Sequence, residues 1–360
     1  MTSKKKRIVS LVVGLVISAV FLAYSLKSVN FADLLTSFRR VNYVWIVPFC
    51  VVTMLSFYLR ALRWQFLLPG CRTSALRLFP PLMIGFAFNG IFPARAGEFA
   101  RAFVLKTRDG VPFGKGFGSV VMERLFDGLT MLIMLLVALR FLTVPPGLDL
   151  EYGGYRITSE QFNALADKAF WPFVVIFLGV LFILFGKTRA LLEQIILRLP
   201  LLPRGMKEKI TGLLHSFADG LGSIRDPRRI ALVIVLSVAI WLLVAWSQQL
   251  LSFGFGDFQM SFLQSLMVML VVVVAIMVPA APGYWGLYEL GGMFGMVIVG
   301  LVQNTESGRA VALSFIILVH ALQMILTIGF GMWYAARAHI SLSQVESAAE
   351  TIEKAPAALH

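Results

Sequence analysis

The spacing of apolar and polar positions along the chain predicts an all-α polytopic membrane protein. Residues 8–26 carry no charged side chain, and a helix of that length crosses about 30 Å of hydrocarbon. The run at 78–93 is shorter and contains Pro80 and Pro81, so it does not predict a complete span. Further apolar runs lie at about 43–64, 117–142, 168–186, 229–250, 258–279, 284–302 and 309–336. We expect about six full spans with two re-entrant hairpins, or about eight spans.

Composition and charge support this class and exclude others. Hydrophobic residues make up 58% of the chain and charged residues 14%, whereas a soluble domain of this length is more polar. The net charge of +13 fits cytoplasmic loops beside anionic lipid, and no nucleic-acid-binding motif is present. The cysteines and histidines do not follow metal-ligand spacing, so we expect no metal and no cofactor.

Charges in the loops predict the side of the membrane that each loop faces, because cytoplasmic loops are rich in lysine and arginine. The first seven residues and the segments 60–77 and 187–229 are basic, so we expect them in the cytoplasm. The loops 143–167 and 251–260 are acidic, so we expect them outside. Both termini are therefore predicted to be cytoplasmic, in a multi-pass protein of the cell membrane.

Two loops add detail to this topology. The loop 27–42 is basic although parity places it outside, and its segment FADLLTSFRR (31–40) is predicted to be an interfacial helix. The segments 60–77 and 101–116 are both basic, so the chain between them must enter the membrane and return on the same side. The break at Pro93–Gly97 is then the tip of a re-entrant hairpin.

The same proline–glycine spacing occurs twice, at Pro93–Gly97 in PARAGE and at Pro282–Gly286 in PGYWGLYE. The shift that aligns these two breaks also brings two pairs of apolar runs close to register. This match favours an inverted repeat, although 258–302 could instead cross the membrane twice. We expect one transmembrane domain at 1–336, with repeat 1 at about 8–142, repeat 2 at about 168–336, a cytoplasmic amphipathic insertion at 187–228 and a cytoplasmic tail at 337–360.

Charged residues flank the first break. Glu98 and Arg101 follow it, and Glu123, Arg124 and Asp127 lie at the start of the next apolar run. Arg124 and Asp127 are three positions apart on a helix, close enough to pair. Together with Arg95 these residues sum to zero charge, which suits a mutually neutralised internal network or a lock between hairpin and span.

Arg95 lies within the first break, before a helix expected to start near Gly97, where free N–H groups and an arginine fork favour phosphate. Arg60 and Arg63 end a predicted span as interfacial anchors or as headgroup-attracting cations. Glu289 serves as a proton or counter-ion site or caps a helix at the interface, and His320 is expected to be a hydrogen-bonded core residue. The candidate headgroup-binding residues are Arg95, Asn89, Gly97, Arg101, Arg60 and Arg63. The candidate network or coupling residues are Glu98, Glu123, Arg124, Asp127 and Glu289, and no catalytic residue is assigned.

Three blocks of this sequence resemble the lysylphosphatidylglycerol synthase transmembrane family, which includes flippase domains and stand-alone flippase-like proteins. They are NGIFPARAGEFAR at 89–101, ERLFD at 123–127 and PGYWGLYE at 282–289. The resemblance covers about residues 8–336 and implies a polytopic protein that moves a lipid between leaflets. Tyr284 and Tyr288 depart from the glycine and the basic residue expected there, which leaves the headgroup undefined.

The resemblance and the charges together predict a translocase of an anionic phospholipid or a polyprenyl-phosphate-type lipid. Only the short segment 337–360 follows the last apolar run, so we expect no soluble aminoacyl-transfer domain. No nucleotide-binding loop is present, so a gradient or mass action would supply the driving force. Two other classes stay open: a membrane-embedded enzyme acting on lipid phosphates, and a structural partner of a lipid-modifying enzyme. Interaction with the membrane is expected, and formation of a homo-oligomer is left open.

Overall fold

The computed structural model describes most of the central part of the chain. The described residues are 29–68, 70–71, 73–92, 96–141, 149–152, 155–158, 226–277 and 282–338, with isolated positions between 16 and 25 and between 160 and 211. The predicted spans at 8–26 and 168–186, the insertion at 187–228 and the tail at 337–360 lie wholly or mostly outside these residues. Arg95, the centre of the predicted hairpin tip, lies outside them as well.

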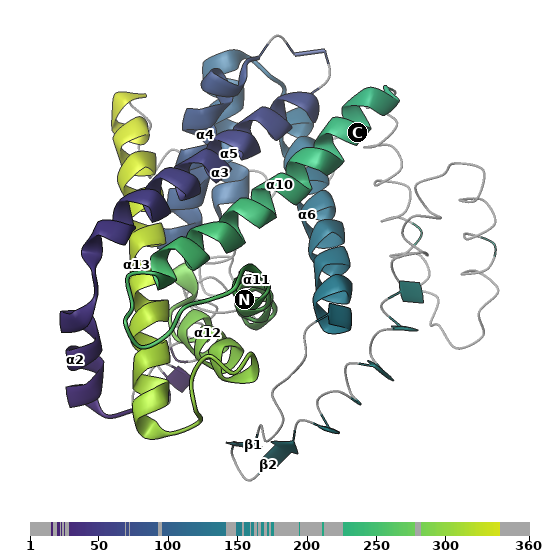
Figure 1. The fold of residues 1–360 in the computed structure, drawn as a ribbon. Helices are drawn as coiled ribbons and strands as arrows, with labels where there is room; N and C mark the ends of the chain where they lie inside the picture. Colours follow the sequence, from purple (N-terminus) through teal and green to yellow (C-terminus); the bar gives the residue numbers. More distant parts are fainter. Residues whose placement is uncertain are drawn as a thin grey trace.

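The described residues are almost entirely helical, which confirms the predicted all-α class (Figure 1). The helices of the first half are α2 (Phe31–Arg40), η1 (Tyr43–Trp45), α3 (Ile46–Phe66), α4 (Ala75–Ile91), α5 (Ala96–Asp109) and α6 (Phe113–Phe141). Those of the second half are α10 (Pro227–Ser252), α11 (Phe262–Ala275), η2 (Pro282–Tyr284), α12 (Leu287–Ile298) and α13 (Glu306–Arg337). Between the halves, β1 (Asp149–Tyr152) and β2 (Tyr155–Thr158) form a short antiparallel hairpin.

Among the described residues, three helices are long and apolar enough to cross a membrane: Tyr43–Phe66, Arg228–Ser252 and Glu306–Arg337. Helix α6 has 29 residues but carries Glu123, Arg124 and Asp127. Helices α11 and α12 have 14 and 12 residues. At about 1.5 Å per residue they extend roughly 21 and 18 Å, less than the thickness of the hydrocarbon core.

Helix α3 shows how the sequence specifies an inside and an outside. Its exposed side is apolar and includes Val47, Val51, Leu55 and Tyr58. Its buried side carries polar residues among apolar ones, and the polar Thr53, Ser56, Arg60 and Arg63 recur at helical spacing. A helix with apolar residues outside and charges inside suits lipid around the protein and a polar interior within it.

The two halves repeat the same order of helices. The shift that aligns Pro93 with Pro282 brings α3, α4, α5 and α6 near α10, α11, α12 and α13. The same shift places the last residue of α5, Asp109, on the last residue of α12, Ile298. The inverted repeat itself, with the two halves in opposite membrane orientation, stays a prediction.

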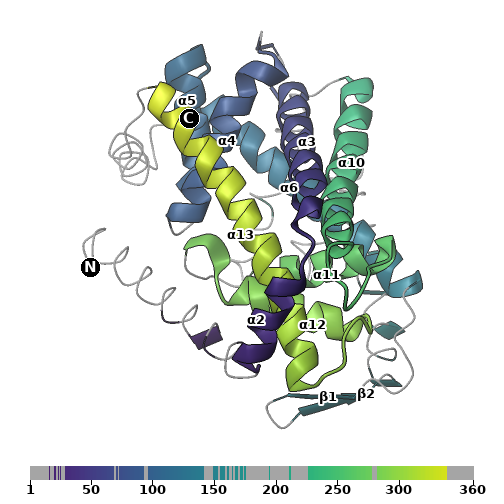
Figure 2. The same cartoon turned by 60° about the vertical axis from the view of Figure 1, so that its left-hand side comes forward.

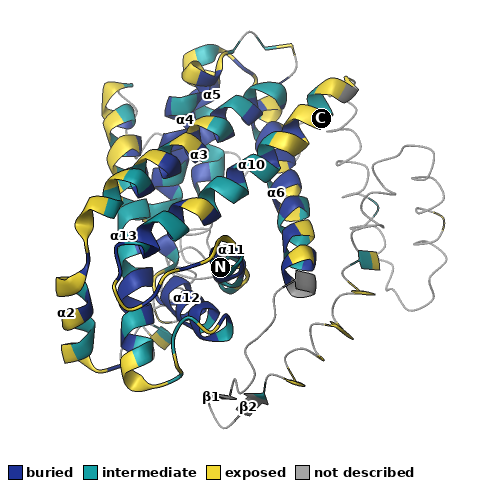
Figure 3. Cartoon of the chain, in the orientation of Figure 1, coloured by how far each residue is buried: buried dark blue, intermediate teal, exposed yellow. Residues whose placement is uncertain are grey.

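Helix α3 lies along α10, and α4 lies along α13, as Figures 1 and 2 show. The short helices α11 and α12 pack against each other and are largely buried (Figure 3). The halves are not packed symmetrically. Helix α4 has an extensive contact with α13, whereas the corresponding helices, α11 and α6, share a much smaller contact.

Candidate functional site

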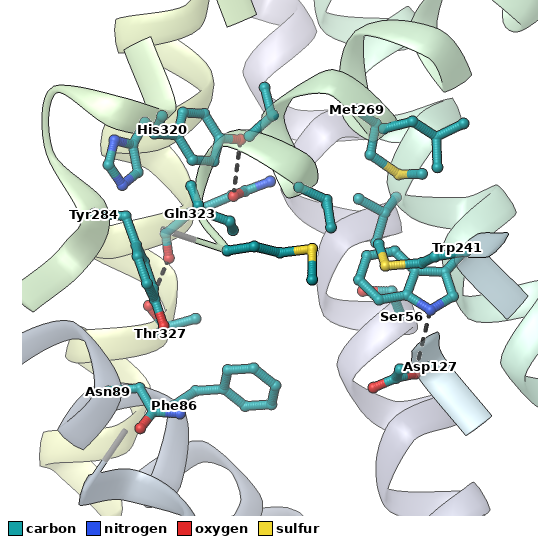
Figure 4. A pocket seen from close by; sticks show the side chains of 18 of the residues that line it. Ser56, Phe86, Asn89, Asp127, Trp241, Met269, Tyr284, His320, Gln323 and Thr327 are labelled. Atoms are coloured by element: carbon teal, nitrogen blue, oxygen red, sulfur yellow. Dashed lines mark hydrogen bonds between the residues drawn. The ribbon is translucent and has the colours of Figure 1, made fainter. Parts of the chain in front are cut away.

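A cavity of about 750 Å³ lies between the two halves. Helices α3, α4, α5 and α6 line it from one half, and α10, α11, α12 and α13, with η2, line it from the other. Its volume is in the range of sites that hold small molecules or headgroups. Figure 4 shows two walls: Ser56, Asp127 and Trp241 lie on one side, and Tyr284, His320, Gln323 and Thr327 lie on the other.

The first wall rests on a cluster of buried ion pairs. Arg101 donates two hydrogen bonds to Glu123, from Nη1 to Oε1 at 3.1 Å and from Nη2 to Oε2 at 2.8 Å. Arg63 approaches Glu123 Oε1 at 3.5 Å, and both side chains are fully buried. Such a bidentate pair is strong and fixes orientation, so Glu123 locks α6 to α5 and α3.

Asp127 is the second centre of this cluster. Arg63 Nη1 donates to its Oδ1 at 2.7 Å, and Trp241 Nε1 donates to the same oxygen at 3.2 Å. Arg124 Nη1 lies 3.4 Å from Oδ2, as the helical spacing predicted. Arg60 Nη1 is 3.7 Å from Oδ2, beyond hydrogen-bonding distance. Asp127 therefore ties α3, α6 and α10 together across the two halves.

The cluster is formally positive. Its described members are four arginines (Arg60, Arg63, Arg101 and Arg124) and three carboxylates (Glu98, Glu123 and Asp127), which leaves one excess positive charge. Arg60 and Arg124 line the cavity, whereas Arg63 and Arg101 do not. The Arg60 guanidinium lies 4.8 Å from the Trp241 ring centroid, a cation–π geometry that holds it in place.

The interpretation of Arg60 and Arg63 as interfacial anchors is wrong. Their side chains are 6% and 0% exposed, because each turns inward toward Asp127. Sequence reasoning missed Trp241 and Ser237, which reach this site from α10; Ser237 Oγ accepts from Arg63 Nη1 at 2.7 Å. The sequence did contain a signal that Arg60 and Arg63 point inward. The polar residues Thr53, Ser56, Arg60 and Arg63 recur at helical spacing and so share one face of α3.

The first break is held by close packing of α4 and α5. Asn89 Oδ1 accepts from the Gly97 N–H at 2.8 Å and so caps the start of α5. A Cβ on Gly97 would collide with the Gly85 carbonyl oxygen, so glycine is required there. Asn89 and Glu98 line the cavity close to this break.

The second break has different chemistry. Gly283 and Gly286 adopt φ of 73° and 88°, and Tyr284 between them adopts 59°, a conformation uncommon for a tyrosine. Glu289 Oε2 accepts from the Gly286 N–H at 2.6 Å, so Glu289 caps α12 from inside the protein. Its Oε1 lies 2.6 Å from His320 Nδ1, and both residues are buried. Glu289 thus makes its contacts away from the arginine cluster, and His320 is hydrogen-bonded in the interior.

The fold and the site define a multi-pass helical membrane protein with an interior charged cluster beside a cavity. This chain belongs to the lysylphosphatidylglycerol synthase TM region family, which matches residues 11–331. It is 27% identical to glycosyltransferase AglD of Haloferax volcanii, over 97% of this chain and 58% of that protein. It is 24% identical to the UPF0104 membrane protein MJ1595 of Methanocaldococcus jannaschii, over 41% of this chain and 45% of that protein. The chain thus spans less than two thirds of either relative, and no solved structure matches it.

Proposed function

We propose that this protein is a lipid translocase that moves an anionic or phosphate-bearing lipid between leaflets without changing it chemically. The observation that supports this most is the position of Arg60 and Arg124, cations of a net-positive cluster that line a cavity shared by both halves. An uncompensated charge is unfavourable inside a membrane protein. A phosphate monoanion beside Arg60 would neutralise the cluster.

The rest of the cavity suits acyl chains. Its walls on α6 and on α11 with the turn that follows it are apolar and include Leu132, Leu135, Val273, Val274 and Met277. Val274 and Met277 are 55% and 70% exposed, so these walls continue to the outer surface of the protein. A lipid could keep its headgroup at the cluster while its chains lie along α6 and α11.

The arrangement of the short helices supports the same function. Interrupted helices at matching places in two repeats are typical of transporter binding sites near the middle of the membrane. Here α4–α5 and α11–α12 are such pairs, and both border the cavity. We place both termini in the cytoplasm of a cell-membrane protein and both pairs in re-entrant hairpins that enter from opposite faces.

Arg95 stays a proposed headgroup contact at the tip of the first hairpin. Arg95→Lys keeps the charge but loses the planar fork, so it should fold and transport more slowly. Arg95→Ala should nearly abolish transport. If a monodisperse Arg95→Ala protein transports lipid at the wild-type rate, Arg95 does not contact the headgroup and the hairpin tip has only a structural role.

Transport is tested in proteoliposomes with fluorescent phosphatidylglycerol and, as a neutral control, fluorescent phosphatidylcholine. We expect faster movement of phosphatidylglycerol, loss of this preference in Arg60→Gln, and no loss in the exposed control Arg108→Gln. Mass spectrometry of the lipids after the assay distinguishes a translocase from a membrane-embedded enzyme, because only an enzyme alters the lipid chemically. This control is needed because the relative AglD is named a glycosyltransferase. A chemically altered lipid, or equal rates with and without protein, would refute the proposal.

A further inference from the structure

We propose that the second wall of the cavity binds a neutral, hydroxyl-rich ring, so that the translocated lipid carries a glycosyl or inositol group on its phosphate. This inference rests on the proposed function and specifies its substrate class. The second wall consists of Tyr284, Tyr288, His320, Gln323 and Thr327, all of which line the cavity. In Figure 4, Tyr284, His320, Gln323 and Thr327 lie across the cavity from Asp127, a member of the charged cluster.

His320, in the wall of the cavity, carries a buried polar atom that has no partner among the described residues. Its Nδ1 is occupied by Glu289, whereas Nε2 has no hydrogen-bond partner among the described residues although His320 is only 1% exposed. A buried polar atom without a partner is unfavourable unless something binds it. His320 lines the cavity, but Nε2 itself is covered by protein atoms, so a ligand hydroxyl would bind it once a neighbouring side chain moves aside.

The surrounding side chains hold that histidine rigidly. The Tyr288 ring stacks on the imidazole with centroids 4.1 Å apart and planes 14° apart, and the Trp285 ring lies 4.4 Å away. The Tyr288 hydroxyl donates to Gln323 Oε1 at 3.2 Å, which fixes the orientation of the amide and leaves its N–H groups available. Nearby hydrogen-bonding groups held in fixed geometry favour one ligand shape over others.

The second wall also repeats along one face of α13. His320, Gln323 and Thr327 lie at helical spacing, so an imidazole nitrogen, an amide and a hydroxyl follow one another beside the cavity. Tyr284 contributes an aromatic face from the strained bend before α12, where its φ is 59°. Backbone strain of this kind is often kept where it positions a functional group.

The charges decide which part of a ligand this wall receives. None of the five side chains of this wall is a lysine, an arginine or a carboxylate. Glu289, the acid that contacts His320, is also engaged by the Gly286 N–H. A phosphate would meet no cation at this wall, so we expect it to bind beside Arg60 and Arg124. Neutral hydroxyl groups could form hydrogen bonds with this wall without leaving a charge unpaired.

Binding of paired lipids tests this assignment on the purified full chain in detergent. One pair is a short-chain prenyl phosphate and the same lipid carrying glucose on its phosphate; the other is phosphatidate and phosphatidylinositol. We expect the ring-bearing member of at least one pair to bind about tenfold more tightly, the equivalent of about 1.4 kcal/mol. The pair with the larger ratio tells whether the ring is a sugar or an inositol.

Variants locate the effect within the cavity. Gln323→Ala and His320→Gln should each lower the ratio within a pair toward one, while affinity for the bare phosphate lipid stays unchanged. Arg60→Gln should weaken both members equally. Equal binding within both pairs by the wild-type protein, or an unchanged ratio in both second-wall variants, would overturn this inference and leave the proposed function standing. Failure of all four lipids to bind the wild-type protein would instead overturn the proposed function.

Discussion

The two interrupted helix pairs of this protein share an architecture but differ in chemistry. The first, α4–α5, packs against α6 through α5, and a buried Arg101–Glu123 pair and a partly exposed Arg124–Glu98 pair join α5 to α6. The second, α11–α12, packs against α13 through apolar and aromatic side chains, with one carboxylate–histidine contact. The order of helices corresponds between the halves, whereas the charges do not. Both pairs border the cavity, and each contributes side chains of a different chemical kind to it.

The largest expected effect concerns the glycines at the two helix pairs. Gly97→Ala should lower the melting temperature in detergent by roughly 10 °C or more, because its Cβ meets the Gly85 carbonyl oxygen, which cannot move aside easily. Gly291→Ala should have a smaller effect, because its Cβ meets the methyl group of Ala275. Gly118→Ala is the control, with open space around its Cβ. A Gly97→Ala protein as stable as the control would show that α4 and α5 are not in such close contact.

The next effect compares the two central carboxylates. Glu123→Gln leaves Arg63 and Arg101 buried without their full partner and should destabilise by about 3–5 kcal/mol. Glu289→Gln should cost about 1–3 kcal/mol, since a glutamine oxygen can still accept from the Gly286 N–H. Glu98→Gln, whose side chain is 18% exposed and whose closest contact is 3.5 Å, should change stability by less than about 1 kcal/mol. Denaturant titration in detergent measures all three, and a reversed order of Glu123 and Glu289 would refute the contrast between the halves.

The smallest effect concerns the tryptophan that joins the two halves at the charged cluster. Trp241→Phe removes the indole N–H that donates to Asp127 and should destabilise by about 0.5–1.5 kcal/mol. Trp333→Phe, at an exposed position of α13, is the matched control and should be near neutral. If both variants melt at the wild-type temperature, the link between α10 and Asp127 contributes nothing to stability.

Much of the fold could be predicted from the sequence, because apolar run length and the proline–glycine breaks are local signals. The runs at 43–64, 229–250 and 309–336 match α3, α10 and α13, and the segment at 31–40 forms α2. The Arg124–Asp127 pair followed from helical spacing within one element.

The long-range contacts of the site could not be predicted in this way. Asp127 and Trp241 lie 114 positions apart, and Glu289 and His320 lie 31 positions apart on separate helices. Which helix faces which is decided by packing of whole elements. The inward position of Arg60 and Arg63 was nevertheless readable from the polar face of α3, had periodicity been given more weight than closeness to the end of the span.

The lipids that remain bound during purification test the central claim most directly. The account predicts that mass spectrometry of the wild-type protein finds phosphate lipids of net negative charge enriched over the surrounding membrane. Arg60→Gln should lose this enrichment while the exposed control Arg108→Gln keeps it, with monodispersity confirming that both variants fold. Equal lipid profiles for the wild-type protein, Arg60→Gln and the bulk membrane would contradict the claim that the excess positive charge at the cavity selects an anionic lipid.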